Sequence, residues 1–199
     1  MPLVRLRVRA LRHVRHDGDR SAISTVFCPG QCRSIDVDTC RRCPRLLSAV
    51  EDTIECAPPK SERLPRELLA EARLGGDVCV GDAMGHIAVS VHAELKAVAL
   101  TRALEEEGAI VAMVVDDDGR LVGLVDAADA ALAIESVRAR ELARRITPVH
   151  ESAPLAHAVD RMVRERARAL PVVDDDGCAV AVLTDLDALH WVALRGGSR

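Results

Sequence analysis

Five of the seven cysteines lie close together in the N-terminal third of the chain. Cys40 and Cys43 are separated by two residues, and Cys28 and Cys32 by three residues that include a Pro-Gly turn. Two closely spaced pairs of thiolates are typical ligands of a tetrahedral zinc site. A short segment with few apolar residues also needs such a cross-link to fold. The spacing predicts a metal-binding segment over residues 27–57, with ligands drawn from Cys28, Cys32, Cys40, Cys43 and Cys56.

Other uses of these thiols stay open. Zinc is favoured, but an iron–sulfur cluster would use the same ligands, and reduced thiols without a metal are a further alternative. Disulfides are disfavoured in the cytoplasm, where we expect this chain to be. A thioredoxin-like exchange at Cys40 and Cys43 is disfavoured because no β-α-β pattern surrounds them. Cys79 and Cys178 stand alone and are interpreted as core or turn residues.

A second group of polar residues lies near the C-terminus. Thr184 follows an apolar stretch that is typical of a strand, and Asp187 lies three residues further on. This spacing predicts a capping box at the start of a helix. A helix N-terminus also suits a phosphate, and a carboxylate one turn into the helix can accept the hydroxyls of a ribose. The residues alone leave two interpretations, a nucleotide site or a helix cap.

The second half of the chain is a duplication. Val114–Gly119 recurs as Val172–Gly177, 58 residues further on, without a gap. Each copy predicts a strand, a helix, a strand, an Asp-Asp-Asp-Gly hairpin turn, a strand and a second helix. The acidic triplets are interpreted as turns and not as cation loops, because they lack the spacing of a calcium site. His92 and His150, at equivalent positions, are interpreted as turn residues.

This duplicated β-α-β-β-α unit resembles the tandem cystathionine-β-synthase-type (CBS) domain pair, also called a Bateman module. Three stretches carry the resemblance: Leu170–Gly177, Val182–Asp187, and the lead-in Val80–Met84. The resemblance implies an α/β (α+β) fold in which two repeats pack with pseudo-twofold symmetry. It also implies a homodimer that binds AMP, ADP, ATP or an S-adenosyl ligand between the repeats and regulates another protein.

The resemblance assigns residues to the ligand site. Thr184 and Asp187 would hold phosphate and ribose, and Asp129 is the equivalent carboxylate of the first copy. Asp126 stands where the family has Ser or Thr, so a negative charge lies where a phosphate would bind. We therefore expect AMP or ATP at the second copy and not at the first. The remaining positions, near the adenine, are Ile146, Thr147, Pro148, Leu170 and Pro171.

Composition excludes several function classes. One Phe, one Trp and no Tyr argue against the aromatic platforms that bind single-stranded nucleic acid, and a net charge of −4 favours neither nucleic acid nor an anionic membrane. No apolar run approaches the length of a membrane span, and no signal-peptide pattern is present. We find no nucleophile–base pair, phosphate loop or dinucleotide fingerprint, and expect no enzyme activity. The alternative function is a metal- or redox-responsive cysteine sensor whose CBS pair serves only for dimerisation.

These patterns predict the domain organisation. Residues 1–26 alternate arginines with apolar residues, which is compatible with a strand, but we expect a disordered basic tail. The cysteine segment is expected to be small and irregular. The remaining boundaries are 58–76 for a linker and a short helix, 77–134 and 135–195 for the two repeats, and 196–199 for a tail.

Overall fold

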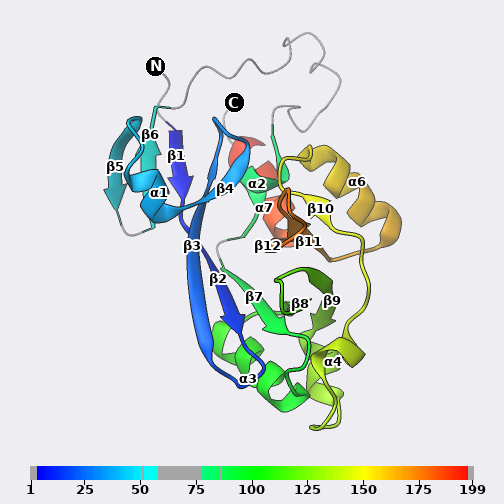
Figure 1. The fold of residues 1–199 in the computed structure, drawn as a ribbon. Helices are drawn as coiled ribbons and strands as arrows, with labels where there is room; N and C mark the ends of the chain where they lie inside the picture. The colour runs from blue at the N-terminus through cyan, green and yellow to red at the C-terminus, as the bar shows by residue number, and fades with distance from the viewer. Residues whose placement is uncertain (1–3, 51, 58–77, 86, 197–199) are drawn as a thin grey trace.

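The computed structural model describes residues 4–50, 52–57, 78–85 and 87–196 (Figure 1). The predicted linker and short helix at 58–76 lie outside the described residues, as does most of the predicted C-terminal tail. Within the described part of the chain, no helix combines the length and the apolarity that a membrane span needs.

The two repeats have the predicted α+β fold, and their elements keep the 58-residue offset. Each repeat has three paired strands. The first strand is parallel to the second, and the second and third form an antiparallel hairpin. The first repeat consists of β7 (Ile87–His92), α3 (Ala97–Glu107), β8 (Val111–Val115), β9 (Leu121–Asp126) and α4 (Ala127–Leu132). The second consists of β10 (Val149–His150), α6 (Leu155–Glu165), β11 (Ala169–Val173), β12 (Ala179–Thr184) and α7 (Asp185–Gly196).

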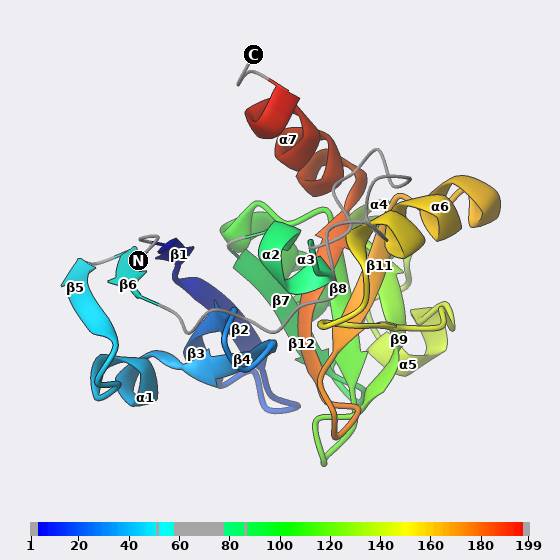
Figure 2. The same ribbon diagram turned by 90° about the horizontal axis from the view of Figure 1, so that it is seen from above.

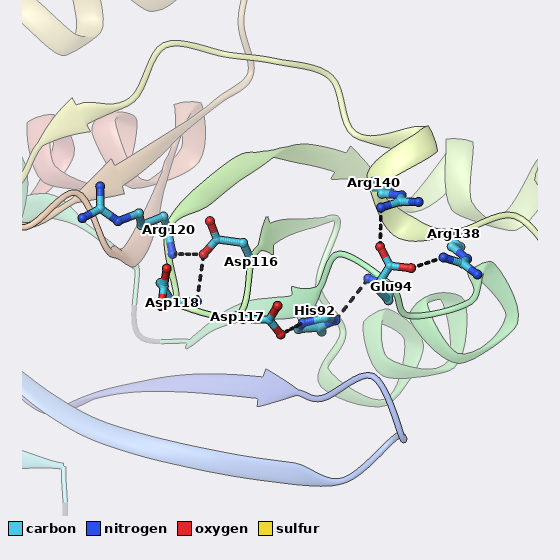
Figure 3. A network of polar contacts seen from close by, with 8 residues as sticks. All are labelled: His92, Glu94, Asp116, Asp117, Asp118, Arg120, Arg138 and Arg140. Carbon is cyan, nitrogen blue, oxygen red and sulfur yellow. Dashed lines mark hydrogen bonds and ion pairs between the residues drawn. The ribbon is translucent and has the colours of Figure 1, made fainter.

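The acidic triplets form the hairpin turns of both repeats. Gly119 and Gly177 have positive φ angles of 77° and 78°, which a glycine adopts without a steric penalty. The Asp116 carboxylate accepts from the backbone N–H groups of Asp118 and Arg120, at 3.0 and 2.9 Å (Figure 3). The carboxylates therefore organise the turn through its own backbone.

Both equivalent histidines pair with the turn of their own repeat. His92 Nε2 lies 2.9 Å from Asp117 Oδ1, as Figure 3 shows. His150 Nε2 lies 3.0 Å from Asp175 Oδ1. These contacts tie the end of the first strand of each repeat to the hairpin beside it.

The sheets of the two repeats pack against each other. Their inner faces share one core, to which Met113 and Leu124 contribute from the first repeat and Ala169 and Val182 from the second. The other face of each sheet is covered by its own helices. The backbone of Ala179 also donates to the carbonyl of Gly119 at 3.2 Å, so the two hairpins meet at their tips.

The lead-in segments are exchanged between the repeats. The short helix α2 (Val80–Ala83) precedes the first repeat in sequence, yet Val80, Ala83 and Met84 pack in the core of the second. In turn, α5 (Ala139–Leu142) precedes the second repeat but packs on the first through Ala139. This exchange places α2 beside α7, the last helix of the second repeat, and α5 beside β9, the last strand of the first.

The expected disordered tail at residues 1–26 is contradicted by the structure. This region contains β1 (Val4–Arg7), β2 (Arg9–Val14) and most of β3 (Arg20–Cys28). Strand β2 pairs in parallel with β7, which extends the first repeat into a six-stranded sheet of order β4-β3-β2-β7-β8-β9, in which β4 spans Arg33–Asp36. The alternation of arginines and apolar residues is thus a strand pattern: in β1, Leu6 is buried between the exposed Arg5 and Arg7. In β2, Arg9 and Val14 are buried on opposite faces and Arg12 is exposed.

The cysteine segment is likewise not irregular. It contains β4 (Arg33–Asp36), α1 (Val37–Arg41), β5 (Leu46–Val50) and β6 (Thr53–Cys56). Strands β1, β6 and β5 form a separate antiparallel sheet in that order. We call residues 4–57 the N-terminal module. Figure 2 shows this module on one side of the repeat pair, with β2, β3 and β4 nearest to the repeats.

A buried polar contact joins the N-terminal module to the second repeat. The Glu151 carboxylate is 1% exposed and accepts from the backbone N–H and the hydroxyl of Ser34 in β4. The Arg9 guanidinium, from β2, is buried nearby and donates to the carbonyl of Gly81. Burial lowers the pKa of Arg9 to about 10, while the carboxylates around it, Glu151 among them, act against this shift. The buried positive charge of Arg9 and the buried negative charge of Glu151 therefore stabilise each other inside the interface.

Phe27 gives the interface its apolar part. Its ring is 3% exposed and lies on Gly81, where a Cβ atom would come within 2.2 Å of the ring. Only a glycine allows this approach of α2 to β3.

We predict that Glu151→Ala destabilises the protein by about 3 kcal/mol, because it leaves the buried N–H and hydroxyl of Ser34 without their acceptor and removes one of the carboxylates that act on the buried Arg9 charge. Limited proteolysis should then cut within residues 4–57 faster than in the unmodified chain. Glu106→Ala is the matched control, since its ion pair with Arg20 is half exposed and should contribute less than about 1 kcal/mol. Equal unfolding free energies for the two variants would contradict a structural role for Glu151.

Candidate functional site

Thr184 and Asp187 form the predicted capping box at the start of α7. The Thr184 hydroxyl accepts from the backbone N–H of Asp187 at 3.1 Å. In return, Asp187 Oδ2 accepts from the Thr184 backbone N–H at 2.9 Å and from its hydroxyl at 2.6 Å. Both residues are half-buried. The box fixes the carboxylate against the first turn of the helix.

The second carboxylate oxygen of Asp187 faces the exchanged lead-in. A Cβ atom on Gly85 would lie 3.1 Å from Asp187 Oδ1, which is tighter than an ordinary contact. Gly85 therefore leaves room beside this oxygen that a larger residue would reduce. The site consequently combines the last helix of the second repeat with the segment that leads into the first.

A cation lies near the start of α7. Arg168 Nε is 3.5 Å from the Asp185 carboxylate, and the backbone N–H of Asp185 donates to the Arg168 carbonyl at 3.0 Å. The guanidinium is 80% exposed, so it can turn toward an anion at the helix end. In the first repeat, the equivalent hydrogen bond runs from the backbone N–H of Ala127 to the carbonyl of Ile110, at 2.9 Å. Ile110 therefore stands in the place of Arg168 and has no charged side chain.

The predicted adenine-contact positions lie at the same end of the sheet of the second repeat. Strands β10 and β11 are parallel and β12 is antiparallel to them, so the starts of the first two adjoin the end of the third at Thr184. Leu170 is fully buried in the core, and Pro171 is buried as well. Ile146 packs partly buried between the repeats. Thr147 and Pro148 turn their carbonyls to Arg161 of α6.

The equivalent position of the first repeat differs. Asp126 is the N-cap of α4, but its side chain makes no capping hydrogen bond. Asp126 and Asp129 are both exposed. Arg144 Nη2 lies 3.9 Å from Asp126 Oδ2, an exposed pair that offsets little of the negative charge. The first helix start therefore presents the carboxylates of Asp126 and Asp129, where the second presents the Thr184 hydroxyl followed by the carboxylates of Asp185 and Asp187.

Four of the five predicted cysteine ligands line one pocket of the N-terminal module, namely Cys28, Cys40, Cys43 and Cys56. Cys32 is not among the lining residues, and its Sγ donates to the Pro29 carbonyl at 3.7 Å. Burial, together with the neighbouring thiols, raises the pKa of Cys40 and Cys56. Among the residues that the structure describes, no three Cys, His, Asp or Glu side chains stand in the arrangement of a formed metal site.

Comparison with known families identifies the repeats. The model of the CBS domain matches residues 80–136 and 139–194, which together make up more than half of the chain. The chain therefore belongs to the CBS domain family. A search of curated proteins finds no match.

Solved structures of CBS proteins share the fold. The CBS domain pair of protein MJ0100, in complex with 5′-methylthioadenosine and S-adenosyl-L-methionine, is 26% identical, with a TM-score of 0.53 over 61% of this chain and 98% of that one. The CBS domain of a membrane protein from Sphaerobacter thermophilus is 20% identical, with a TM-score of 0.51 over 57% and 87%. Hypoxic Response Protein I, with two coordinated zinc ions, is 22% identical, with a TM-score of 0.51 over 57% and 98%.

Three residues near the Thr184–Asp187 site were not predicted from the sequence. Arg168 shows no pattern of its own, although its alignment with Ile110 across the repeat would have marked the difference. Gly85 follows the lead-in, and only the exchange of lead-ins brings it to Asp187. Arg9 was assigned to a tail, whereas it is buried close enough to Asp82, Glu151 and Asp187 for these carboxylates to oppose the lowering of its pKa.

We predict that Thr184→Ala lowers the free energy of unfolding by about 1 kcal/mol, because it removes the hydroxyl that caps α7. Asp126→Ala is the matched control at the equivalent position, where no side-chain cap exists, and its effect should be within about 0.5 kcal/mol. Urea denaturation of both variants measures the difference. A larger loss for Asp126→Ala would contradict the assigned asymmetry.

Proposed function

We propose that this protein is a non-catalytic regulatory module that binds one adenine nucleotide per chain, between the repeats and at the start of α7. The observation that carries this proposal is the closed Thr184–Asp187 box beside Gly85, with one carboxylate oxygen facing the lead-in. The solved CBS pair with 26% identity holds adenosine derivatives, which supports a ligand of this class.

Each residue has a distinct part in the proposed site. Asp187 accepts the ribose hydroxyls through the oxygen that Thr184 does not use. The N-terminus of α7, together with Arg168, binds the phosphate or another anionic group of the ligand. The adenine lies against the backbone and the aliphatic side chains at the end of the sheet, where residues 146–148 and 170–171 begin their strands.

The first repeat is proposed to bind no phosphate-bearing nucleotide. Its helix start carries Asp126 in place of a neutral hydroxyl, and Ile110 in place of Arg168. A phosphate at this helix start would meet the Asp126 carboxylate at the N-cap itself, and Arg144, 3.9 Å from that carboxylate in an exposed pair, offsets little of its charge. Like charges at this distance repel each other.

We further propose a cytoplasmic homodimer whose ligand state controls an unidentified protein partner. Leu186 and Leu189 on α7 are each 64% exposed, and Leu132 at the end of α4 is 87% exposed. A second copy of the chain would cover these apolar side chains in a symmetric pair. The alternative, in which the cysteines alone sense a metal or redox state, predicts no effect of nucleotides on stability.

Isothermal calorimetry with AMP and ATP should give one site per chain. Asp187→Ala should abolish binding because it removes the acceptor for the ribose hydroxyls, whereas Asp129→Ala, at the equivalent position, should leave the affinity unchanged. Two sites of equal affinity in the unmodified chain would contradict the proposal, as would undiminished binding by Asp187→Ala.

Arg168→Met should weaken AMP binding roughly three-fold, since the exposed guanidinium interacts with the phosphate across solvent. Adenosine has no phosphate, so its affinity should not change. The control is Arg164→Met, which removes an exposed charge on α6 that pairs with Asp160. Equal losses for AMP and adenosine would show that Arg168 does not act on the phosphate.

A further inference from the structure

The N-terminal module collects four thiols from three separate segments around one pocket. Cys28 ends β3, Cys40 and Cys43 belong to α1 and the turn that follows it, and Cys56 ends β6. The sequence spacing did not distinguish among five cysteines, and the fold selects these four. The other lining residues are the apolar Leu6, Ile35 and Leu46, together with Gly30, Gln31, Thr39 and Arg45.

Strands and a helix hold three of the four cysteines, and a hydrogen-bonded turn holds Cys43. The Asp36 carboxylate caps α1 by accepting from the backbone N–H of Asp38 at 2.8 Å, which fixes the helix that carries Cys40. The backbone N–H of Cys43 donates to the Cys40 carbonyl at 3.0 Å, so these two cysteines share one tight turn. Cys56 lies in the central strand β6, paired with Val4 on one side and Leu46 on the other.

Cys32 is held apart from this group. It follows the turn in which the backbone N–H of Gln31 donates to the Cys28 carbonyl at 3.2 Å, and it has a positive φ of 52°. Its thiol is directed to the Pro29 carbonyl. The Cys28 turn therefore supplies one thiol to the pocket and not two.

The module has a small core of its own. Its buried cluster consists of six residues, and two of them are the cysteines Cys40 and Cys56. A module that buries so few apolar side chains needs a cross-link for much of its stability, and the four thiols lie where a bound metal ion would cross-link its segments. None of the seven cysteines, all of which lie among the described residues, forms a disulfide. Arg45 also lines the pocket and would offset part of the negative charge of four thiolates.

From this geometry we propose that Cys28, Cys40, Cys43 and Cys56 bind one Zn²⁺ ion, and that Cys32 is not a ligand. The thiols surround the pocket without standing at coordination geometry, so binding draws them inward by rotation of their side chains. Zn²⁺ suits four sulfur ligands in a closed, tetrahedral, structural site. This site is separate from the nucleotide site of the repeats and does not depend on it.

The test is zinc analysis of the full-length chain, purified under reducing conditions and dialysed against metal-free buffer. We expect one Zn²⁺ per chain. Cys56→Ser should weaken Zn²⁺ binding by more than the roughly 10–100-fold that accompanies loss of a residue that only supports a ligand. Cys32→Ser is the matched control and should retain one Zn²⁺ with unchanged affinity. Equal losses in the two variants would overturn the selection of the four ligands.

A second measurement covers the case in which Cys56→Ser fails to fold. Co²⁺ added to the unmodified metal-free chain should produce sulfur-to-metal charge-transfer absorption at one equivalent, and the same titration of Cys32→Ser should give the same spectrum. Absence of this absorption in the unmodified chain, together with absence of zinc, would overturn the proposal. A bound iron–sulfur cluster, seen as iron and acid-labile sulfide, would also overturn it.

Discussion

The packing of the two repeats against each other is the constraint on which the rest of the structure depends. Each repeat has one three-stranded sheet, with helices on a single face. The other face carries apolar residues such as Met113, Leu124 and Val182, which are buried only where the second sheet covers them. Neither repeat can bury its inner face alone, so the pair is the folding unit. The exchanged lead-ins strengthen this dependence, because Val80 and Ala139 each complete the core of the opposite repeat.

The same packing creates two related sites that need not be equal. Each last helix begins where a hairpin strand ends, beside the lead-in of the other repeat. In the second repeat, the hydroxyl of Thr184 closes a capping box and Arg168 adds a positive charge. In the first, Asp126 makes no cap and Ile110 adds no charge. The two repeats therefore share one backbone fold, while a few different side chains at the helix start give the two sites different charges.

Local and periodic features of the sequence predicted the repeat pair well. The 58-residue offset fixed the order of the strands and helices, and Thr184 with Asp187 predicted the capping box, because these features depend on neighbours within a few residues. The strands of the N-terminal module were not predicted, since β2 finds its partner β7 more than seventy residues further along the chain. The alternation at Arg5, Arg7 and Arg9 was visible, but it contains no information about that partner. The choice of four cysteines among five likewise depends on how β3, α1 and β6 meet in space.

We propose that the two equivalent helix starts differ in their ability to bind a nucleotide. The most direct measurement is a titration of the isotope-labelled full-length protein with AMP, followed through its backbone amide resonances. We expect saturable shifts at Thr184 to Asp187 and at Gly85, with little change at Asp126 to Asp129. Comparable shifts at both helix starts, or shifts confined to the first, would contradict it.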